Sequence, residues 1–183
     1  MIDSLQVSVV IPVFNEEPVL KEFYPRLKKE AESWDKSYEL LFVDDGSTDN
    51  SFELISEWKK VDSAIRVIKF TRNFGQQAAV LAGFRKSRGE IVVQIDSDLQ
   101  NPPEEIKRLL DAFTDEIDLV VTVPRKRRDS LLRILGSKVL QSTAQVLFGN
   151  RFKLNLSSFR AMRRSVIEKI DQCQDRSRYM AVL

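Results

Sequence analysis

The chain has 183 residues, 43% of them hydrophobic and 31% charged, and carries a formal net charge of +2. This length and composition fit a single globular domain with a substantial core, and they exclude collagen-like, coiled-coil and wholly disordered chains. The absence of histidine excludes a His-dependent triad or His-ligated zinc, and the one cysteine, Cys173, excludes an internal disulfide.

Short β-rich apolar runs alternate with amphipathic segments through residues 1–124. In chain order, these patterns predict a strand at 7–13, a helix at 16–33, a strand at 38–43, a helix capped by Thr48 or Asp49, a strand at 65–70, a helix at 76–87, a strand at 91–95, a helix starting at 102 and a strand at 118–123. Continuous apolar strands separated by helices are typical of a mostly parallel sheet with helices on both faces. We therefore predict an α/β fold.

Polar clusters follow four of the predicted strands. They are Asn15-Glu16, Asp44-Asp45-Gly46, Arg72-Asn73-Phe74-Gly75 and Asp96-Ser97-Asp98. Ligands of parallel sheets bind at the carboxyl ends of the strands. Because packing alone does not require carboxylates at so many strand ends, we predict a binding site at this edge.

Asp96-Ser97-Asp98 is the most informative of these clusters. Two carboxylates one residue apart at a strand end can share a divalent cation, and hard oxygen ligands favour Mg²⁺ or Mn²⁺, which also take diphosphate oxygens as ligands. An isolated Asp-x-Asp is more often only a turn. The preceding strand and the three similar strand ends favour the metal site here.

Asp44-Asp45-Gly46 has two interpretations. It is either a simple turn, in which Asp-Gly is common, or a place where a carboxylate accepts hydrogen bonds from a nucleotide base or ribose. The glycine-rich phosphate-binding loops G-x-G-x-x-G and G-x₄-G-K-[ST] do not occur in the sequence.

The two parts of the sequence differ in charge. Residues 1–124 have a net charge of −8 and residues 125–183 a net charge of +10. Within the basic part, residues 131–148 form a helix-like segment with a broad apolar face. Such a segment either lies on a membrane surface or packs on the protein, and the sequence favours neither. Since no uninterrupted apolar stretch of about 18 residues occurs, the chain as written is expected to be cytosolic and to span no membrane.

Three longer motifs resemble the family 2 glycosyltransferases, which have the nucleotide-diphospho-sugar transferase (GT-A) fold. They are residues 9–16 (VVIPVFNE), 43–49 (VDDGSTD) and 96–104 (DSDLQNPPE). The last of these, together with residues 72–76 (RNFGQ), resembles the polyprenyl-phosphate branch of that family. The resemblance continues through residues 160–164 (RAMRR) and covers essentially the whole chain.

The resemblance implies roles for residues at the donor. The nucleotide-sugar pocket would be lined by Pro12, Phe14, Glu16, Asp45, Asn73, Asp96 and Ser97. Asp45 would read the base, and Asp96 would hold the ribose or metal end of the donor. A Mg²⁺ or Mn²⁺ ion would be held by Asp96, Asp98 and Gln100.

The resemblance also implies a seat for an acceptor phosphate, formed by Arg125, Arg133 and Ser137. Arginine suits this role because its planar guanidinium donates two parallel hydrogen bonds to a phosphate. The catalytic residues would be Asp98, Arg125 and Arg133. The acidic part of the chain would then hold metal and nucleotide, and the basic part would face anionic lipid.

Two departures from the family accompany this resemblance. Family members often carry an acidic residue, cast as a base, at the place of Leu154 or Asn155. A lipid monophosphate with a second pKa of roughly 6 is already ionised near neutral pH. Such an acceptor needs no base to remove a proton, so the absence of this acidic residue matters less. The branch also usually continues into C-terminal transmembrane helices. We therefore expect one catalytic domain over residues 1–183, with a donor part at 1–124 and an acceptor part at 125–183, either truncated before such helices or served by a separate membrane partner.

The function implied is inverting, metal-dependent transfer of a sugar from a nucleotide-diphosphate donor to a polyprenyl phosphate such as undecaprenyl phosphate. Among the possible donors, a UDP-sugar is favoured. It would take place at the cytoplasmic face of the cell membrane, in cell-envelope glycan biosynthesis. Two alternatives stay open: a soluble family 2 enzyme acting on a glycan or protein hydroxyl, and a non-catalytic nucleotide-binding module. No nucleic-acid partner is expected, and the oligomeric state is left open.

Overall fold

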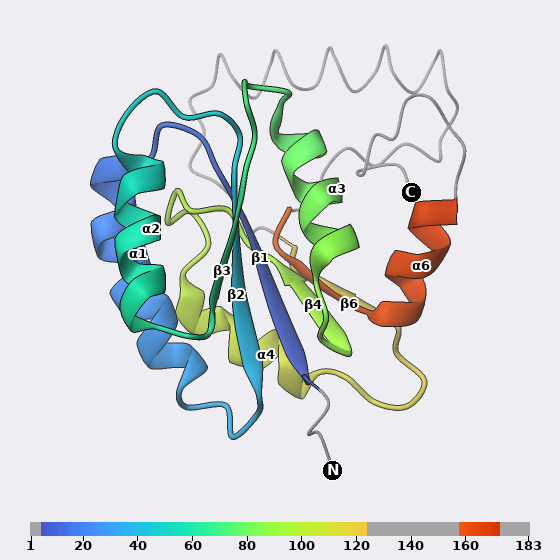
Figure 1. The fold of residues 1–183 in the computed structure, drawn as a ribbon. Coiled ribbons are helices and arrows are strands. Elements are labelled where there is room, and N and C mark those ends of the chain that lie inside the picture. Colours follow the sequence, from blue (N-terminus) through green and yellow to red (C-terminus); the bar gives the residue numbers. More distant parts are fainter. Residues whose placement is uncertain (1–4, 124–157, 173–183) are drawn as a thin grey trace, which may run out of the picture.

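The computed structural model describes residues 5–123 and 158–172, which fold around a six-stranded sheet (Figure 1). The strands are β1 (Val7–Val13), β2 (Tyr38–Asp44), β3 (Ile65–Lys69), β4 (Ile91–Gln94), β5 (Leu119–Val121) and β6 (Arg160–Arg163). The helices are α1 (Glu17–Ala31), α2 (Ser51–Val61), α3 (Gln76–Lys86), the short 3-10 helix η1 (Pro103–Glu105), α4 (Ile106–Asp111) and α6 (Arg164–Gln172).

The strand order is β3-β2-β1-β4-β6-β5. Strands β1 to β4 pair in parallel, whereas β6 is antiparallel to both of its neighbours, β4 and β5. Five strands therefore run in one direction and only β6 opposes them. The predicted α/β fold with a mostly parallel sheet is confirmed.

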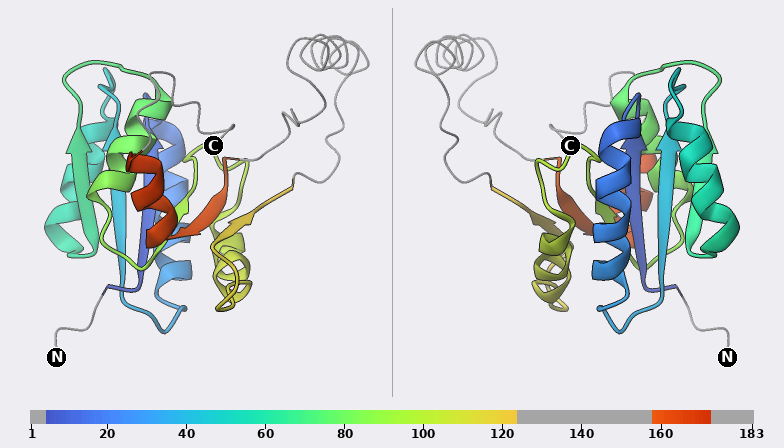
Figure 2. Two further views of the ribbon diagram at one scale, coloured as in Figure 1. Left: turned by 90° about the vertical axis from the view of Figure 1, so that its right-hand side faces the viewer. Right: turned by 90° about the vertical axis from the view of Figure 1, so that its left-hand side faces the viewer.

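Helices cover both faces of the sheet, as predicted, and the two layers can be followed in Figures 1 and 2. The sequence of β1 is apolar except for Ser8, and its side chains alternate between the layers because successive residues of a strand point to opposite faces. Val9 and Ile11 belong to the core beneath α1, α2 and α4, and Val10 to the core beneath α3 and α6. A Cβ atom on Gly83 of α3 would lie 2.3 Å from Val10 Cγ1, so this glycine permits close packing of α3 on β1.

Strand β6 and helix α6 are absent from the predicted elements. The strand has only four residues, with arginine at both ends, and so lacks the apolar run by which strands are recognised. Its inner residues, Ala161 and Met162, are nevertheless buried between β4 and β5. The side chain of Arg163 donates hydrogen bonds to the carbonyl groups of Ile117 and Thr114, at 3.1 and 2.8 Å. Pairing on both sides makes this segment a strand.

Most predicted boundaries agree with the observed ones within one or two residues, and larger differences occur at the last two predicted elements. The strand predicted at 118–123 is shorter and pairs only with β6, at the edge of the sheet. The helix predicted from residue 102 consists of η1 and α4 and ends at Asp111, so Phe113 packs on the core from beyond the helix.

Several predictions fall outside the described residues. These are the helix-like segment at 131–148, the acceptor residues Arg125, Arg133 and Ser137, and the departures at Leu154 and Asn155. Within 5–123 and 158–172, no helix has both the length and the apolar character needed to cross a membrane.

Candidate functional site

A pocket of about 340 Å³ lies at the carboxyl edge of the sheet, at the upper end of the strands in Figure 1. Its lining comes from the ends of β1 to β4 and the start of α3, and consists of Pro12, Val13, Phe14, Glu16, Asp45, Asn73, Gln76, Asp96, Ser97 and Asp98. The structure thus brings together every residue predicted for the nucleotide-sugar pocket, and Asp98 with them. Gln100 is not among the lining residues.

Asn15 joins the loop after β1 to the loop after β2. Its backbone has a positive φ of 55°, and its side-chain Oδ1 accepts hydrogen bonds from the backbone N–H of Thr48 at 2.8 Å and the Thr48 hydroxyl at 3.3 Å. In return, the Asn15 N–H donates to Ser47 Oγ at 3.0 Å. Asparagine tolerates this left-handed backbone better than most residues. These bonds set the position of Phe14 and Glu16 on either side of Asn15.

Asp49 has a linking role that differs from the predicted cap of α2. Helix α2 begins at Ser51 with Asn50 as its N-cap residue, so the prediction of Thr48 or Asp49 as the cap is wrong in position. The Asp49 carboxylate accepts hydrogen bonds from the N–H groups of Ser51 at 3.0 Å and of Glu17 at 3.1 Å. It therefore ties the first turns of α1 and α2 together, next to the pocket.

Asp45 is buried and holds the loop after β3. Its two carboxylate oxygens accept hydrogen bonds from the backbone N–H groups of Phe74 at 2.8 Å and Gly75 at 2.9 Å. The neighbouring Gly46 has φ +72°, and a Cβ atom on it would lie 2.4 Å from the carbonyl carbon of Arg72. Glycine is required at this close approach. Asp45 thus shapes the pocket wall, and its predicted contact with a base remains a prediction.

Asp96 is held from two sides at the end of β4. Its Oδ1 accepts a hydrogen bond from Gln76 Nε2 at 2.7 Å, and its Oδ2 accepts one from the Ser158 hydroxyl at 2.6 Å. Neither Gln76 nor Ser158 was predicted. Gln76 is the last residue of the RNFGQ motif, which was a signal for it, whereas nothing in the local sequence points to Ser158, 62 residues away from Asp96.

Asp98 is exposed and forms a local turn. Its Oδ1 accepts a hydrogen bond from the backbone N–H of Gln100 at 3.0 Å, and Leu99 between them has a positive φ of 59°. A leucine in this conformation is strained by about 1–3 kcal/mol, and such strain persists where the surrounding structure imposes it. The remaining lone pairs of the Asp98 carboxylate are available to a ligand in the pocket.

The pocket concentrates negative charge. The pKa of Glu16 is raised above its ordinary value of 4.5, first because burial penalises the charged form and then because of repulsion from Asp98, Asp49 and Asp96. In the described part of the chain, neither Glu16 nor Asp98 forms an ion pair with a basic side chain. A divalent cation would relieve this repulsion.

The donor set suits a cation that shares its ligands with a substrate. Within the described ranges, no three acidic, Cys or His side chains lie close enough to form a complete metal site. Mg²⁺ and similar ions usually take one or two carboxylates and complete their shell with water and phosphate oxygens. Asp98, supported by Asp96, fits that pattern.

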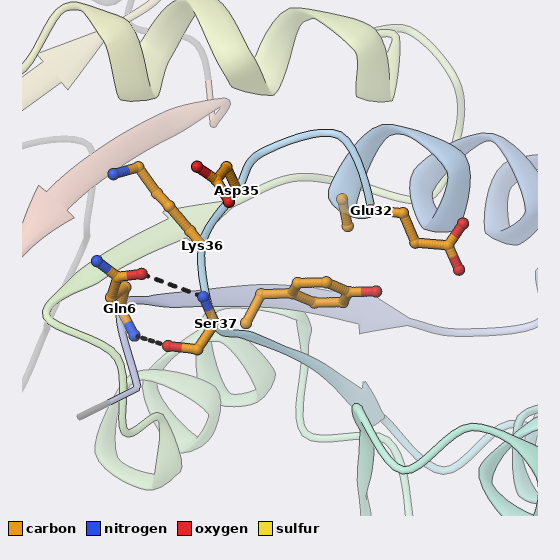
Figure 3. Close-up of a pocket in the computed structure, with 7 residues that line it drawn as sticks. Gln6, Glu32, Asp35, Lys36 and Ser37 are labelled. Carbon is orange, nitrogen blue, oxygen red and sulfur yellow. Dashed lines mark hydrogen bonds between the residues drawn. The ribbon is translucent and has the colours of Figure 1, made fainter. Parts of the chain in front are cut away.

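A second, larger hollow of about 540 Å³ lies at the opposite edge of the sheet, around the turn between α1 and β2 (Figure 3). Two reciprocal hydrogen bonds at 3.1 Å join Gln6 and Ser37 there, from the Gln6 N–H to Ser37 Oγ and from the Ser37 N–H to Gln6 Oε1. Figure 3 shows the side chains of Glu32 and Lys36 pointing to opposite sides of this hollow. Because its polar groups do not converge, its size does not make it the functional site.

The sequence matches the profile of Glycosyl transferase family 2 over residues 8–171. Two similar proteins are both named undecaprenyl-phosphate 4-deoxy-4-formamido-L-arabinose transferase. That of Salmonella choleraesuis (strain SC-B67) is 41% identical over 179 residues, which are 97% of this chain and 55% of the relative. That of Aeromonas hydrophila is 40% identical over 182 residues, 99% of this chain and 56% of the relative. The chain therefore spans about half the length of the curated relatives it matches.

Two solved structures have a similar fold. Glucosyl-3-phosphoglycerate synthase from Mycobacterium tuberculosis, in complex with Mn²⁺, UDP and phosphoglyceric acid, has a TM-score of 0.61 and 26% identity, over 88% of this chain and 56% of that one. The mannosyltransferase PcManGT from Pyrobaculum calidifontis, in complex with GDP-Man and Mn²⁺, has a TM-score of 0.65 over 90% of this chain and 46% of that one. Its identity is 22%, so it supports the fold alone. The predicted GT-A fold is confirmed.

Proposed function

Because this chain belongs to glycosyl transferase family 2, we propose that it transfers a sugar from a nucleotide-diphosphate donor to a polyprenyl phosphate such as undecaprenyl phosphate. A UDP-sugar is the favoured donor. The observation that carries the proposal is that the ends of β1, β2 and β4 place Phe14, Asp45, Asp96 and Asp98 together in one pocket. A pocket lined by several carboxylates and by one exposed phenylalanine suits a nucleotide bound through a cation.

The donor half of the proposal rests on the chemistry of the pocket. Phe14 is 42% exposed and offers an apolar surface to a base or sugar. Asp98 and Asp96 would hold a Mg²⁺ or Mn²⁺ ion, and such an ion, when bound, neutralises the developing charge of a diphosphate leaving group. The similarity to a synthase solved with Mn²⁺ and UDP supports this assignment. The protein itself orients these carboxylates and holds the loops around the pocket in place.

The acceptor half of the proposal rests on the names of the relatives and on the basic part of the sequence. Relatives about 40% identical over nearly all of this chain are named undecaprenyl-phosphate transferases. Arg125, Arg133 and Ser137 would seat the acceptor phosphate. A phosphate oxygen needs placement and charge neutralisation rather than a base, because the second pKa of such a monophosphate is roughly 6. We place the reaction at the cytoplasmic membrane face, with inversion at the sugar carbon.

The test supplies the protein with Mn²⁺, undecaprenyl phosphate and a panel of radiolabelled nucleotide sugars, and measures label in the lipid phase. Labelled lipid from one donor is the expected result. Replacing the lipid phosphate with a glycan or protein hydroxyl acceptor distinguishes the alternative acceptor class. If the folded protein labels no lipid with any donor, the proposed acceptor is wrong.

The acceptor residues have a test of their own. Arg125→Ala and Arg133→Ala should each lower kcat/KM for the lipid phosphate about ten- to a hundredfold, because a hydrogen bond to a charged group contributes roughly 1.5–3 kcal/mol. Nucleotide affinity should stay as in the wild type. If Arg125→Ala weakens nucleotide binding as well, Arg125 contacts the donor diphosphate, and the acceptor seat reduces to Arg133 and Ser137.

A further inference from the structure

We infer that Gln76 and Ser158 are positioning residues that orient the Asp96 carboxylate in the donor pocket; the inference rests on the proposed function. Both side chains donate to Asp96, Gln76 to Oδ1 at 2.7 Å and Ser158 to Oδ2 at 2.6 Å. With one donor on each oxygen, the carboxylate plane cannot rotate without breaking a hydrogen bond. The lone pairs that remain on Asp96 therefore have a fixed direction relative to Asp98.

The Gln76 side of this clamp is built by the loop after β3. Gln76 is the first residue of α3, and it follows Gly75, whose φ of +92° turns the chain into the helix. The N–H of Gly75 is held by Asp45 at 2.9 Å, and no atom lies within 4 Å of the place where a Gly75 Cβ would be. The position of Gln76 is thus set by the buried carboxylate of Asp45, which directly follows β2.

The Ser158 side is built by the antiparallel part of the sheet. The next residue, Phe159, is buried, and its carbonyl oxygen accepts hydrogen bonds from the N–H of Thr122 at 3.2 Å and the Thr122 hydroxyl at 2.9 Å. Ser158 therefore stands on a rigid base at the start of β6. The segment that leads into the antiparallel strand β6 therefore holds Asp96, a carboxylate of the proposed nucleotide-sugar pocket.

The hydrogen bonds from Gln76 and Ser158 have two opposite effects on Asp96 as a metal ligand. Each neutral donor takes up part of the charge of Asp96, so Asp96 is a weaker ligand than a free carboxylate but a better oriented one. Partners that orient a metal-binding carboxylate typically affect metal affinity or activity by 10–100-fold when they are removed. The chain offers this orientation before any ligand arrives, which reduces the reorganisation needed on binding.

The experiment measures UDP binding by calorimetry as a function of Mn²⁺ concentration, and again in EDTA. Ser158→Ala and Gln76→Ala should each shift the Mn²⁺ dependence of UDP binding about tenfold or more to higher Mn²⁺. For Ser158→Ala, which does not change a lining residue of the pocket, binding in EDTA should stay within about twofold of wild type. Ser158→Thr keeps the hydroxyl and should restore the wild-type dependence.

Two matched variants separate positioning from folding. Thr122→Val removes a hydrogen bond to the residue beside Ser158, and Gln77→Ala truncates the exposed neighbour of Gln76 on the same helix. Both should keep the wild-type Mn²⁺ dependence. In Thr122→Val the backbone N–H of residue 122 still donates to the Phe159 carbonyl and keeps Ser158 in place, although loss of the hydroxyl bond should lower the Tm. Gln76 is itself exposed, so Gln76→Ala tests the inference even if Ser158→Ala does not fold.

Two results would overturn the inference in different ways. Wild-type Mn²⁺ dependence in both Ser158→Ala and Gln76→Ala, or an equal shift in Thr122→Val, would show that the clamp has no positioning role while leaving the proposed function intact. If the wild-type protein binds UDP no better with Mn²⁺ than in EDTA, the metal-dependent donor site is wrong and the clamp inference falls with it.

Discussion

The two edges of the sheet both carry buried or half-buried carboxylates, but they treat them differently. At the amino edge, the carboxylate of Glu39, 4% exposed, accepts hydrogen bonds from Ser8 Oγ at 2.6 Å, from the N–H of Arg88 at 2.8 Å and from the Arg66 guanidinium at 2.7 Å. At the carboxyl edge, Glu16 and Asp98 form no ion pair within the described residues, and the pKa of Glu16 is raised.

This difference separates a structural carboxylate from the carboxylates proposed to bind a ligand. The charge of Glu39 is compensated by Arg66 of the neighbouring strand, and its oxygens are filled by donors from the chain. In the pocket, Glu16 is repelled by Asp98, Asp49 and Asp96, and a bound cation would reduce this repulsion. The two edges therefore differ in whether a basic side chain among the described residues compensates the carboxylate charge, and the size of the nearest hollow does not distinguish them.

The largest effect is expected at the carboxyl edge. Asp98→Asn should lower Mn²⁺-dependent donor binding and transfer at least about a hundredfold, because it removes a proposed metal ligand. Since Asp98 is exposed, the Tm should barely change. Asp111→Asn, on the exposed face of α4, is the control and should behave as wild type. A full transfer rate for Asp98→Asn at limiting Mn²⁺ contradicts the metal role.

The amino edge should give the opposite result. Glu39→Ala removes the acceptor of three hydrogen bonds and leaves Arg66 without its carboxylate, so the free energy of unfolding should fall by about 3 kcal/mol. This corresponds to a Tm lower by about 6–12 °C for a chain of this size. The affinity for UDP should not change. Glu39→Gln, which can still accept hydrogen bonds, should lose less, and a selective loss of UDP affinity would refute the structural assignment.

The loop contact between the strands gives an intermediate effect. Gly46→Ala should cost about 2 kcal/mol of stability, because the new Cβ would strike the Arg72 backbone and φ is +72°. Gly75→Ala carries only the strain of its φ of +92° in open space, so it should cost about 1 kcal/mol. Urea unfolding compares the two variants. Equal losses would mean that the close approach at Gly46 is unimportant.

The smallest effect is a pH dependence. Because the pKa of Glu16 is higher in the folded protein than its ordinary 4.5, the folded state binds this proton more tightly than the unfolded state does. The contribution of Glu16 to the stability of the metal-free protein should therefore decline as pH rises from about 4.5 through the raised pKa, and the penalty is fully present above it. Thermal unfolding in EDTA between about pH 4 and 7 measures this decline.

Glu16→Gln provides the matched comparison for that profile. The variant cannot ionise at residue 16, so its stability should decline less over the same pH range. Added Mn²⁺ should reduce the difference between wild type and variant, since the cation offsets the repulsion. Superimposable profiles of the two proteins in EDTA would mean that the charge at the pocket does not affect folding.

Much of the candidate donor site could be predicted from local sequence. Apolar runs alternating with amphipathic segments predict parallel strands, and parallel strands place their carboxyl ends at one edge. For this reason Glu16, Asp45, Asp96 and Asp98 could be assigned to one pocket before their contacts were known, and all four line it. The roles of Arg125, Arg133 and Ser137 depend on the resemblance and stay predictions.

Only the tertiary structure decided how those side chains are held. Strand β6 has no apolar run and exists because β4 and β5 pair with it on both sides. Its placement brings Ser158 to Asp96, a contact across 62 residues that no local pattern encodes. Likewise, Asp45 looked like a turn residue or a base reader, and the fold uses its carboxylate to hold Phe74 and Gly75. Local sequence determines which residues prefer burial and which strand ends are polar, whereas hydrogen bonds between distant segments depend on how the whole chain packs.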